Sequence, residues 1–126
     1  MIFSLGIDIG TSGVKTATLN TRGEVLSNSS IKHIYQNSDK INPSIWWETV
    51  KKAVKLNLIN LKKKRINFIK IEKLAVDGTS GTVLLANENL QPVTRALMYN
   101  ATGFIKESRI IEKYSPENHI AKGQNS

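Results

Sequence analysis

The sequence predicts an α/β fold, and three observations lead to this class. Three strand-like segments come first, at residues 2–9, 14–20 and 25–35. A segment with helical periodicity follows at residues 44–63, and a further strand-like segment occupies residues 69–76. A strand that follows a helical crossover normally lies parallel to the strand it joins. We therefore expect an antiparallel meander packed against one helix, with the fourth strand parallel to the first.

The first strand ends in a turn suited to phosphate. It brings one acid, Asp8, to a turn of glycines and hydroxyl residues: Gly10, Thr11, Ser12 and Gly13. Glycines let the backbone approach an anion closely and turn its N–H groups toward it. A carboxylate beside them suits Mg²⁺, which prefers oxygen ligands and usually keeps several waters. We therefore expect phosphate binding at residues 10–13 with Asp8 as metal ligand. A plain hairpin with a capping Asp is the alternative.

Two better-known phosphate motifs do not fit this turn. The Walker motif requires Gly-x4-Gly-Lys-Ser/Thr before a helix, whereas Gly13 and Lys15 lead into a second strand. The dinucleotide fingerprint requires Gly-x-Gly-x-x-Gly, and the glycines here stand at positions 6, 10 and 13. The remaining interpretation is a strand–turn–strand hairpin whose turn faces phosphate.

A tight turn at residues 21–24 leads into the third strand, and a polar loop at residues 36–42 leads into the helix. Asn42 is expected to cap this helix, with Pro43 at its first position, where a missing N–H costs nothing. One face carries residues at three- and four-residue steps, with most lysines opposite: Trp46, Val50, Ala53, Val54, Asn57, Leu58 and Leu61. Trp46 and its neighbour Trp47 are interpreted as core and anchor residues.

The fourth strand ends in a second turn of glycines and hydroxyls, at residues 77–81. If this strand is parallel to the first, both turns emerge at the same sheet edge, where ligands bind in open α/β sheets. Asp8 and the hydroxyls of Thr79 and Ser80 would then flank one cleft. Asp77 is interpreted as a residue that caps its own turn.

Beyond the second turn we expect two more short strands, at residues 82–86 and 96–99, with a turn at residues 87–89 between them. A helix is expected around residues 105–114, and it should stop before Pro116.

The composition indicates one small intracellular domain. The chain has 126 residues, enough for one core but not for two full domains. It contains no cysteine and therefore no disulfide framework. We recognise neither a signal peptide nor an apolar run of membrane-spanning length. We therefore expect a cytoplasmic protein that does not bind a membrane.

A net charge of +8 raises the alternative of a nucleic-acid partner. The densest basic run is at residues 62–65, with further lysines upstream in the same helix. No aromatic residues interleave with this run to stack bases, and no nucleic-acid motif is present. A solvated helix face, whose cations suit the negative end of the helix dipole, is the favoured interpretation.

Four stretches together resemble one family, the FGGY carbohydrate kinases. Residues 7–15 resemble its first phosphate motif, and residues 42–48 its Pro-x-x-Trp-Trp helix start. Residues 74–85 resemble its next strand and sugar-facing turn, and residues 91–100 complete the pattern. The resemblance implies the ribonuclease H-like fold of actin, Hsp70 and hexokinase. Residues 1–126 would be a partial N-terminal kinase domain, lacking the rest of domain one and all of domain two.

The resemblance also implies roles for these residues. The reaction would be transfer of the ATP γ-phosphoryl group to a primary hydroxyl of a sugar. Residues 10–13 would grip the β- and γ-phosphates, and Lys15 would add charge or simply be exposed. Asp8 would orient Mg²⁺ and contact the sugar. Ser80 and Thr79 would hold the sugar.

No residue of this chain is expected to act as the catalytic base. In the family the base is an Asp that lies far downstream, together with the adenosine-binding elements. His33, in the alternation of the third strand, and His119, near the end of the chain, are interpreted as incidental.

The second turn bears on the substrate. Typical xylulose kinases resemble Ser-Gly-Gln-Met-His-Gly here, whereas this chain has the short hydroxyl of Ser80. Asn100 is kept and either reaches the sugar or caps a turn, while Ala101 replaces an acid common in the family. The pattern is similar to the cyanobacterial and plastid ribulose/xylulose-kinase-like branch. This favours D-ribulose, with D-xylulose next.

The chain by itself is expected to be inactive and to self-associate through exposed core surface. Two other classes stay open: a non-catalytic phosphate- or sugar-binding module, and a basic protein associated with nucleic acid.

Overall fold

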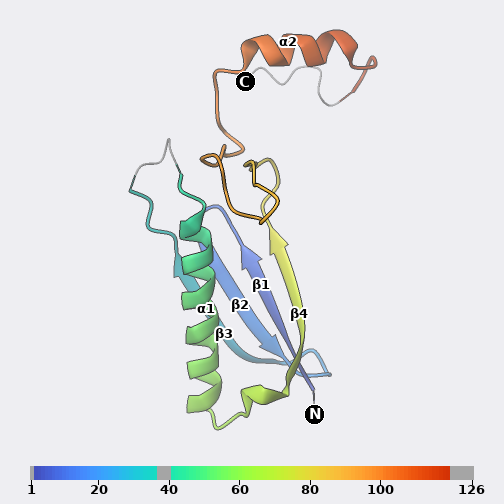
Figure 1. The fold of residues 1–126 in the computed structure, drawn as a ribbon. Coiled ribbons are helices and arrows are strands. Elements are labelled where there is room, and N and C mark those ends of the chain that lie inside the picture. The colour runs from blue at the N-terminus through green and yellow to red at the C-terminus, as the bar shows by residue number, and fades with distance from the viewer. Residues whose placement is uncertain (1, 37–40, 120–126) are drawn as a thin grey trace.

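The centre of the molecule is a four-stranded sheet with the strand order β3-β2-β1-β4. The computed structural model describes residues 2–36 and 41–119. Strands β1 (Phe3–Ile9), β2 (Gly13–Leu19) and β3 (Val25–Lys32) form an antiparallel meander, and β4 (Ile71–Gly78) lies parallel to β1 (Figure 1). The predicted meander and the parallel fourth strand are therefore confirmed.

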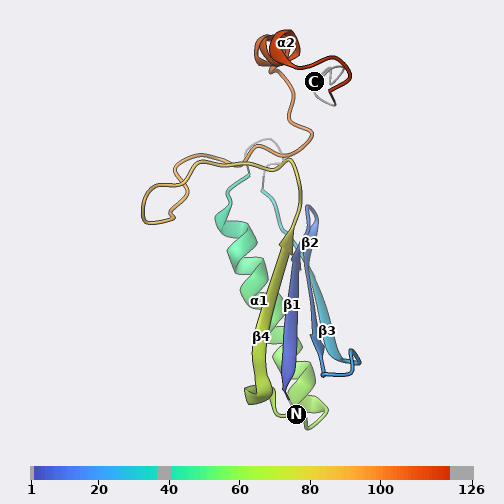
Figure 2. The ribbon, with the colours of Figure 1, turned by 90° about the vertical axis from the view of Figure 1, so that its right-hand side faces the viewer.

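Helix α1 (Ser44–Lys63) covers one face of this sheet (Figure 2). Its buried Val50 and Ala53 pack on Leu5, Ile7 and Val14 of the first hairpin. Full burial of one such large apolar side chain stabilises the fold by about 1.5–3 kcal/mol. The crossover from β3 through α1 places β4 beside β1, so this packing also determines where the second turn lies.

The other half of the α1 interface is polar, and Asn57 is at its centre. This residue is fully buried. Its Oδ1 accepts from the Thr18 hydroxyl, and its Nδ2 donates to Thr16 Oγ1, both at 2.8 Å. The hydroxyls of Thr16 and Ser29 lie 2.7 Å apart, and Ser29 donates to the Ala53 carbonyl. A buried amide is tolerated only when its polar atoms are paired, and here they are.

Several element ends differ from the prediction by a few residues. Helix α1 has the predicted bounds, but Pro43 is its N-cap rather than its first residue, and Asn42 Oδ1 accepts from the Ser44 N–H at 3.1 Å. Strand β3 ends at Lys32 rather than at residue 35, because the chain beyond it turns toward residues 10–13. The fourth strand begins after a short 3₁₀ turn, η1 (Phe68–Lys70).

The predicted strands at residues 82–86 and 96–99 are wrong. Only isolated bridges form there, between Ile41 and Ala96, between Val83 and Leu97, and between Ala86 and Pro92. A short two-stranded ribbon with no sheet or helix beneath it is marginal in water, and proline lacks an N–H for a ladder. Helix α2 (Ile105–Tyr114) forms as predicted and stands away from the sheet (Figure 1).

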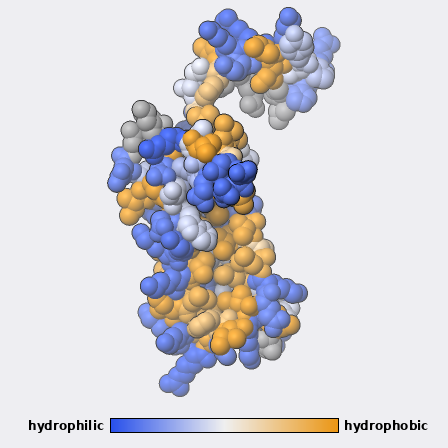
Figure 3. Space-filling model, in the orientation of Figure 1, coloured by the Kyte–Doolittle hydropathy of each residue, from blue (hydrophilic) through white to orange (hydrophobic). Residues whose placement is uncertain are grey.

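An apolar surface lies between α1 and β4 (Figure 3). Trp47, Leu74 and Val76 are 63%, 64% and 60% exposed there, beside a groove of about 530 Å³.

None of the helices in the described ranges is long and apolar enough to cross a membrane. The basic run at residues 62–65 is exposed at the end of α1, where the Lys64 ammonium donates to the Leu26 carbonyl at 2.8 Å.

Candidate functional site

The turn at residues 10–13, called here the first glycine turn, has all four of its carbonyls tied back into the protein. Gly13 O accepts from the Gly10 N–H at 2.9 Å, which closes the turn. Ser12 O accepts from the backbone N–H of His33 at 3.0 Å. The His33 imidazole Nε2 contacts Gly10 O at 3.0 Å. Tyr35 Oη donates to Thr11 O, also at 3.0 Å.

The backbone N–H groups in the middle of this turn differ from its carbonyls. Within residues 2–36 and 41–119, the N–H groups of Thr11 and Ser12 donate to no protein acceptor. Ser12 is exposed and Thr11 half-buried, so these donors are within reach of a ligand. Successive N–H groups freed in this way make a concavity that binds anions. The chemistry of these donors suits an anion such as phosphate rather than a cation.

Only glycine fits at position 13. A Cβ there would stand 2.4 Å from the Ile31 carbonyl oxygen and 2.9 Å from Lys32 Cα. Both atoms belong to the backbone of β3, which cannot move aside without breaking its ladder with β2. The close approach of β3 to this turn is what allows His33 and Tyr35 to reach the turn carbonyls.

Two groups of helix α1 support these contacts from behind. The indole Nε1 of Trp46 donates to Tyr35 Oη at 3.1 Å. The hydroxyl of Thr49 lies 3.0 Å from His33 Nδ1. The first glycine turn, the chain after β3 and the start of α1 are thus connected by hydrogen bonds. Trp46 thus has the structural role predicted for it, whereas the interpretation of His33 as incidental is wrong, and no role was predicted for Tyr35.

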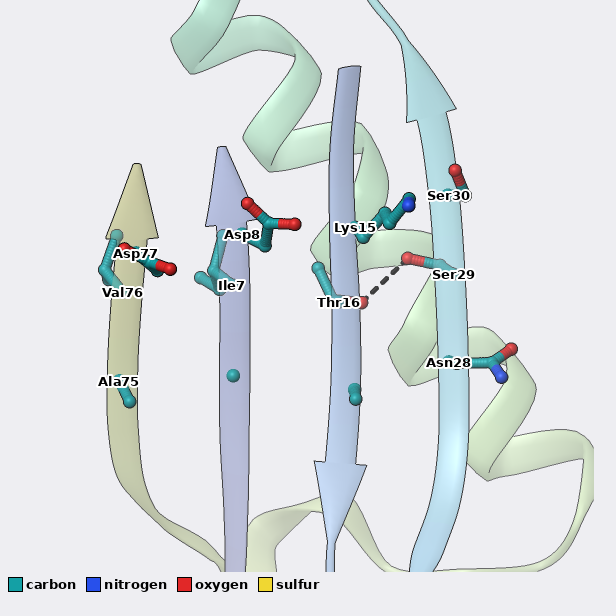
Figure 4. A pocket seen from close by; sticks show the side chains of 12 residues that line it. Ile7, Asp8, Lys15, Thr16, Asn28, Ser29, Ser30, Ala75, Val76 and Asp77 are labelled. Carbon is teal, nitrogen blue, oxygen red and sulfur yellow. Dashed lines mark hydrogen bonds between the residues drawn. The ribbon is translucent and has the colours of Figure 1, made fainter. Parts of the chain in front are cut away.

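Charged and polar side chains form a row across the sheet at the level of the two turns. Asp77 pairs in register with Asp8, Asp8 with Lys15, and Lys15 with Ser30. All four lie on the sheet face away from α1, beside an open cavity of about 630 Å³ (Figure 4). Asp8 and Lys15 are both exposed, so a ligand can reach them.

This row fits a magnesium ion bound together with phosphate. Two neighbouring carboxylates, Asp8 and Asp77, offer the oxygen ligands that Mg²⁺ prefers. Asp77 Oδ1 already accepts from the Gly78 N–H at 2.9 Å, as expected of a residue that caps its turn. Among the residues that the structure describes, no cluster of three or more metal-ligating side chains occurs. Phosphate oxygens and water would therefore complete the coordination of an ion at Asp8.

The turn at residues 77–81, called here the second glycine turn, meets the first one at a smaller cavity. This cavity of about 180 Å³ is lined by residues of both turns and their neighbours: Ile9, Gly10, Thr11, Trp46, Gly78, Thr79, Thr82 and Met98. The prediction that the two turns emerge at one edge of the sheet is thus confirmed. Asp8 lies on the larger cavity instead, while Ser80 and Asn100 are exposed and line neither of these two.

A meander, a crossover helix and a parallel strand, with glycine turns at the strand ends, define the class of ribonuclease H-like ATPase folds. The model of the FGGY family of carbohydrate kinases, N-terminal domain, matches residues 3–124. The chain therefore belongs to the FGGY family of carbohydrate kinases.

Three proteins illustrate this likeness. The xylulose kinase of Staphylococcus xylosus is 26% identical over 117 residues, which cover 90% of this chain and 23% of that protein. The structure of xylulose kinase from Bifidobacterium adolescentis matches with a TM-score of 0.70 at 24% identity, over 89% of this chain and 21% of that one. Plasmodium falciparum glycerol kinase with ADP matches with a TM-score of 0.74 at 13% identity, over 92% and 24%. The chain thus spans about a quarter of the length of these relatives.

Proposed function

We propose that this chain is the phosphate-binding part of a sugar kinase that transfers the γ-phosphoryl group of ATP to a hydroxyl of a ketopentose. One observation carries the proposal. Within the described residues, the first glycine turn directs its four carbonyls into the protein and leaves the N–H groups of Thr11 and Ser12 without a protein acceptor. Phosphoryl transfer depends on positioning and on neutralising the phosphate oxygens, and such a turn serves both needs.

The residues around the turn take complementary roles. The N–H groups and hydroxyls of Thr11 and Ser12 bind the β- and γ-phosphates, and the exposed Lys15 adds positive charge. Asp8 holds Mg²⁺ through its carboxylate or through water, at the larger cavity that it lines together with Asp77 of the second glycine turn. Mg²⁺, when bound, neutralises charge on the phosphate oxygens.

The second glycine turn supplies the sugar side. Thr79 lines the cavity shared with the first turn, Ser80 follows it directly in the sequence, and Asn100 offers an exposed amide. D-ribulose is the first candidate substrate because Ser80 replaces the His typical of xylulose kinases. D-xylulose is the second, in keeping with the name of the Staphylococcus xylosus relative. The structure of a glycerol kinase also has a similar fold, so the fold alone does not determine which substrate is bound.

The test is release of ADP from the purified chain with Mg-ATP and with D-ribulose or D-xylulose. We expect no turnover, because the resemblance places the catalytic Asp outside residues 1–126. The same chain should nevertheless bind Mg-pyrophosphate, and Asp8→Ala should weaken that binding. Ketopentose-dependent turnover that disappears in Asp8→Ala would show a complete site within this chain. A folded chain that binds neither nucleotide nor pyrophosphate would contradict the proposal.

A non-catalytic binding module is the second candidate, because the whole first glycine turn and its supports lie within this chain. Saturable binding of Mg-ATP by a stable monomer, without turnover in any longer form of the protein, would favour it. We expect self-association instead, since Leu74 and Val76 are largely exposed. Sedimentation analysis separates the two expectations.

A further inference from the structure

Two side chains that follow β3, His33 and Tyr35, are the main support of the first glycine turn. We propose that both are positioning residues that hold the turn in the conformation that accepts phosphate. The expected effect on phosphate binding rests on the proposed function. The structural basis of the inference is independent of that function, because it concerns the carbonyls of residues 10–12 only.

His33 is buried at the end of the meander, and its two ring nitrogens have different partners. A carbonyl oxygen can only accept, so the Nε2 that contacts Gly10 O carries a hydrogen and donates it. Nδ1 lies 3.0 Å from the hydroxyl of Thr49, which also lies 2.8 Å from the Ile45 carbonyl, so its one hydrogen serves one of these two acceptors at a time. These contacts hold the plane of the imidazole so that Nε2 faces the turn.

Tyr35 works through a second chain of donors. Its hydroxyl donates to Thr11 O at 3.0 Å and accepts from the indole Nε1 of Trp46 at 3.1 Å. The direction of these bonds follows from chemistry, since the indole can only donate and the carbonyl can only accept. The rings of Tyr35 and His33 lie 5.3 Å apart, so the two side chains also support each other.

The turn depends on these contacts because it forms few hydrogen bonds within itself. Of its four carbonyls, only that of Gly13 is bonded from within the turn, by the Gly10 N–H. The other three accept from His33 or Tyr35. Without the side chains, Gly10 O and Thr11 O lose their donors and become free to rotate toward the ligand. Carbonyl oxygens facing a phosphate repel it, whereas a fixed nest of N–H groups attracts it.

The test compares four variants of the 126-residue chain. His33→Leu removes both ring contacts, whereas His33→Gln keeps an N–H donor at a similar position. Tyr35→Phe removes only the hydroxyl. Ser27→Ala is the control, because it deletes a buried hydrogen bond, to Asn57 O at 3.1 Å, without touching the turn. NMR follows two readouts: the amide shifts of Thr11 and Ser12 on titration with Mg-pyrophosphate, and, without ligand, the hydrogen exchange of the Gly10 N–H, which donates to Gly13 O.

We expect His33→Leu to weaken Mg-pyrophosphate binding about tenfold and Tyr35→Phe about fivefold, as the loss of hydrogen bonds of ordinary strength implies. Exchange of the Gly10 N–H should become faster in both. His33→Gln should stay within about twofold of the wild type, and Ser27→Ala should not change binding. The proposal is overturned if His33→Leu and Tyr35→Phe bind as the wild type does, or if Ser27→Ala weakens binding as much as they do.

The two readouts separate this inference from the proposed function. If the wild type shows no response to Mg-pyrophosphate, phosphate binding is refuted and the exchange readout alone decides about positioning. Faster exchange of the Gly10 N–H in His33→Leu, restored in His33→Gln, would then still identify His33 as the residue that orders the turn. Unchanged exchange in His33→Leu would refute that role.

Discussion

The two glycine turns have similar sequences but are held in different ways. Both follow parallel neighbouring strands and combine glycines with hydroxyl residues. Other segments of the chain hold the first one, with three carbonyls bonded from His33 and Tyr35. The second one is exposed, and its side-chain contacts are local: Asp77 Oδ1 accepts from the Gly78 N–H, and Thr79 Oγ1 donates to Ser80 O and lies 3.5 Å from Thr82 Oγ1.

The difference teaches that composition alone does not make a turn rigid. The first turn joins two strands inside the meander and lies against the start of α1, so neighbours surround it. The second turn leaves the sheet from the outer strand β4, where few contacts are available. Preorganisation lowers the cost of ordering a site when a ligand binds. We therefore expect the first turn to bind its ligand without rearrangement and the second to become ordered on binding.

Glycine replacements should give the largest contrast between the turns. Gly13→Ala places a Cβ against the backbone of β3 and should lower the free energy of unfolding by about 3 kcal/mol. Gly78→Ala meets nothing within 4 Å and should leave it unchanged or raise it by up to about 1 kcal/mol. Urea unfolding of both variants measures the difference. Equal destabilisation would mean that the close approach of β3 to the first turn is not real.

Asn57→Ala should separate the stability of the core from the order of the first turn. The variant leaves the buried hydroxyl of Thr18 without its acceptor and should cost about 2 kcal/mol of unfolding free energy. Because Asn57 does not touch residues 10–13, Mg-pyrophosphate affinity of the folded fraction should not change. A parallel loss of stability and affinity would show that the turn depends on global stability only.

Replacing Asp8 and Asp77, which pair in register, by asparagine should show which of the two carboxylates binds the metal. Asp8→Asn should weaken Mg²⁺-dependent binding of pyrophosphate about tenfold, because it removes the carboxylate charge beside the first turn. Asp77→Asn should have a smaller effect, since Asp77 Oδ1 already accepts from the Gly78 N–H. Titrations with and without Mg²⁺ provide the measurement. A larger effect at Asp77 would reverse the assignment.

Ser80→Ala should have the smallest effect. The side chain is exposed, so the free energy of unfolding should change by less than about 0.5 kcal/mol. Binding of Mg-pyrophosphate should not change either, whereas any affinity for D-ribulose should fall a few-fold through the lost hydroxyl. Calorimetric titration with D-ribulose and D-xylulose checks the last point. Weaker pyrophosphate binding would place Ser80 at the phosphate side instead.

The sequence allowed the core elements and the edge shared by the two turns to be predicted. Strand and helix periodicities are local patterns, and a crossover helix leaves few choices for the next strand. The predicted strands at residues 82–86 and 96–99 failed because local propensity does not reveal whether a ribbon will find a surface to pack on. Asn57 was placed in the buried stripe of α1, but the periodicity did not reveal its hydroxyl partners.

By itself, the sequence determined the order of the elements of the core, the glycines and hydroxyls of both turns, and the resemblance to the FGGY kinases. These follow from residue types at short spacing along the chain. Only the tertiary structure decided that His33 and Tyr35 hold the first turn, and that Ser80 and Asn100 stand outside the cavity shared by the turns. Such contacts join segments distant in sequence, and they exist only because α1 and β3 pack at one particular distance from residues 10–13.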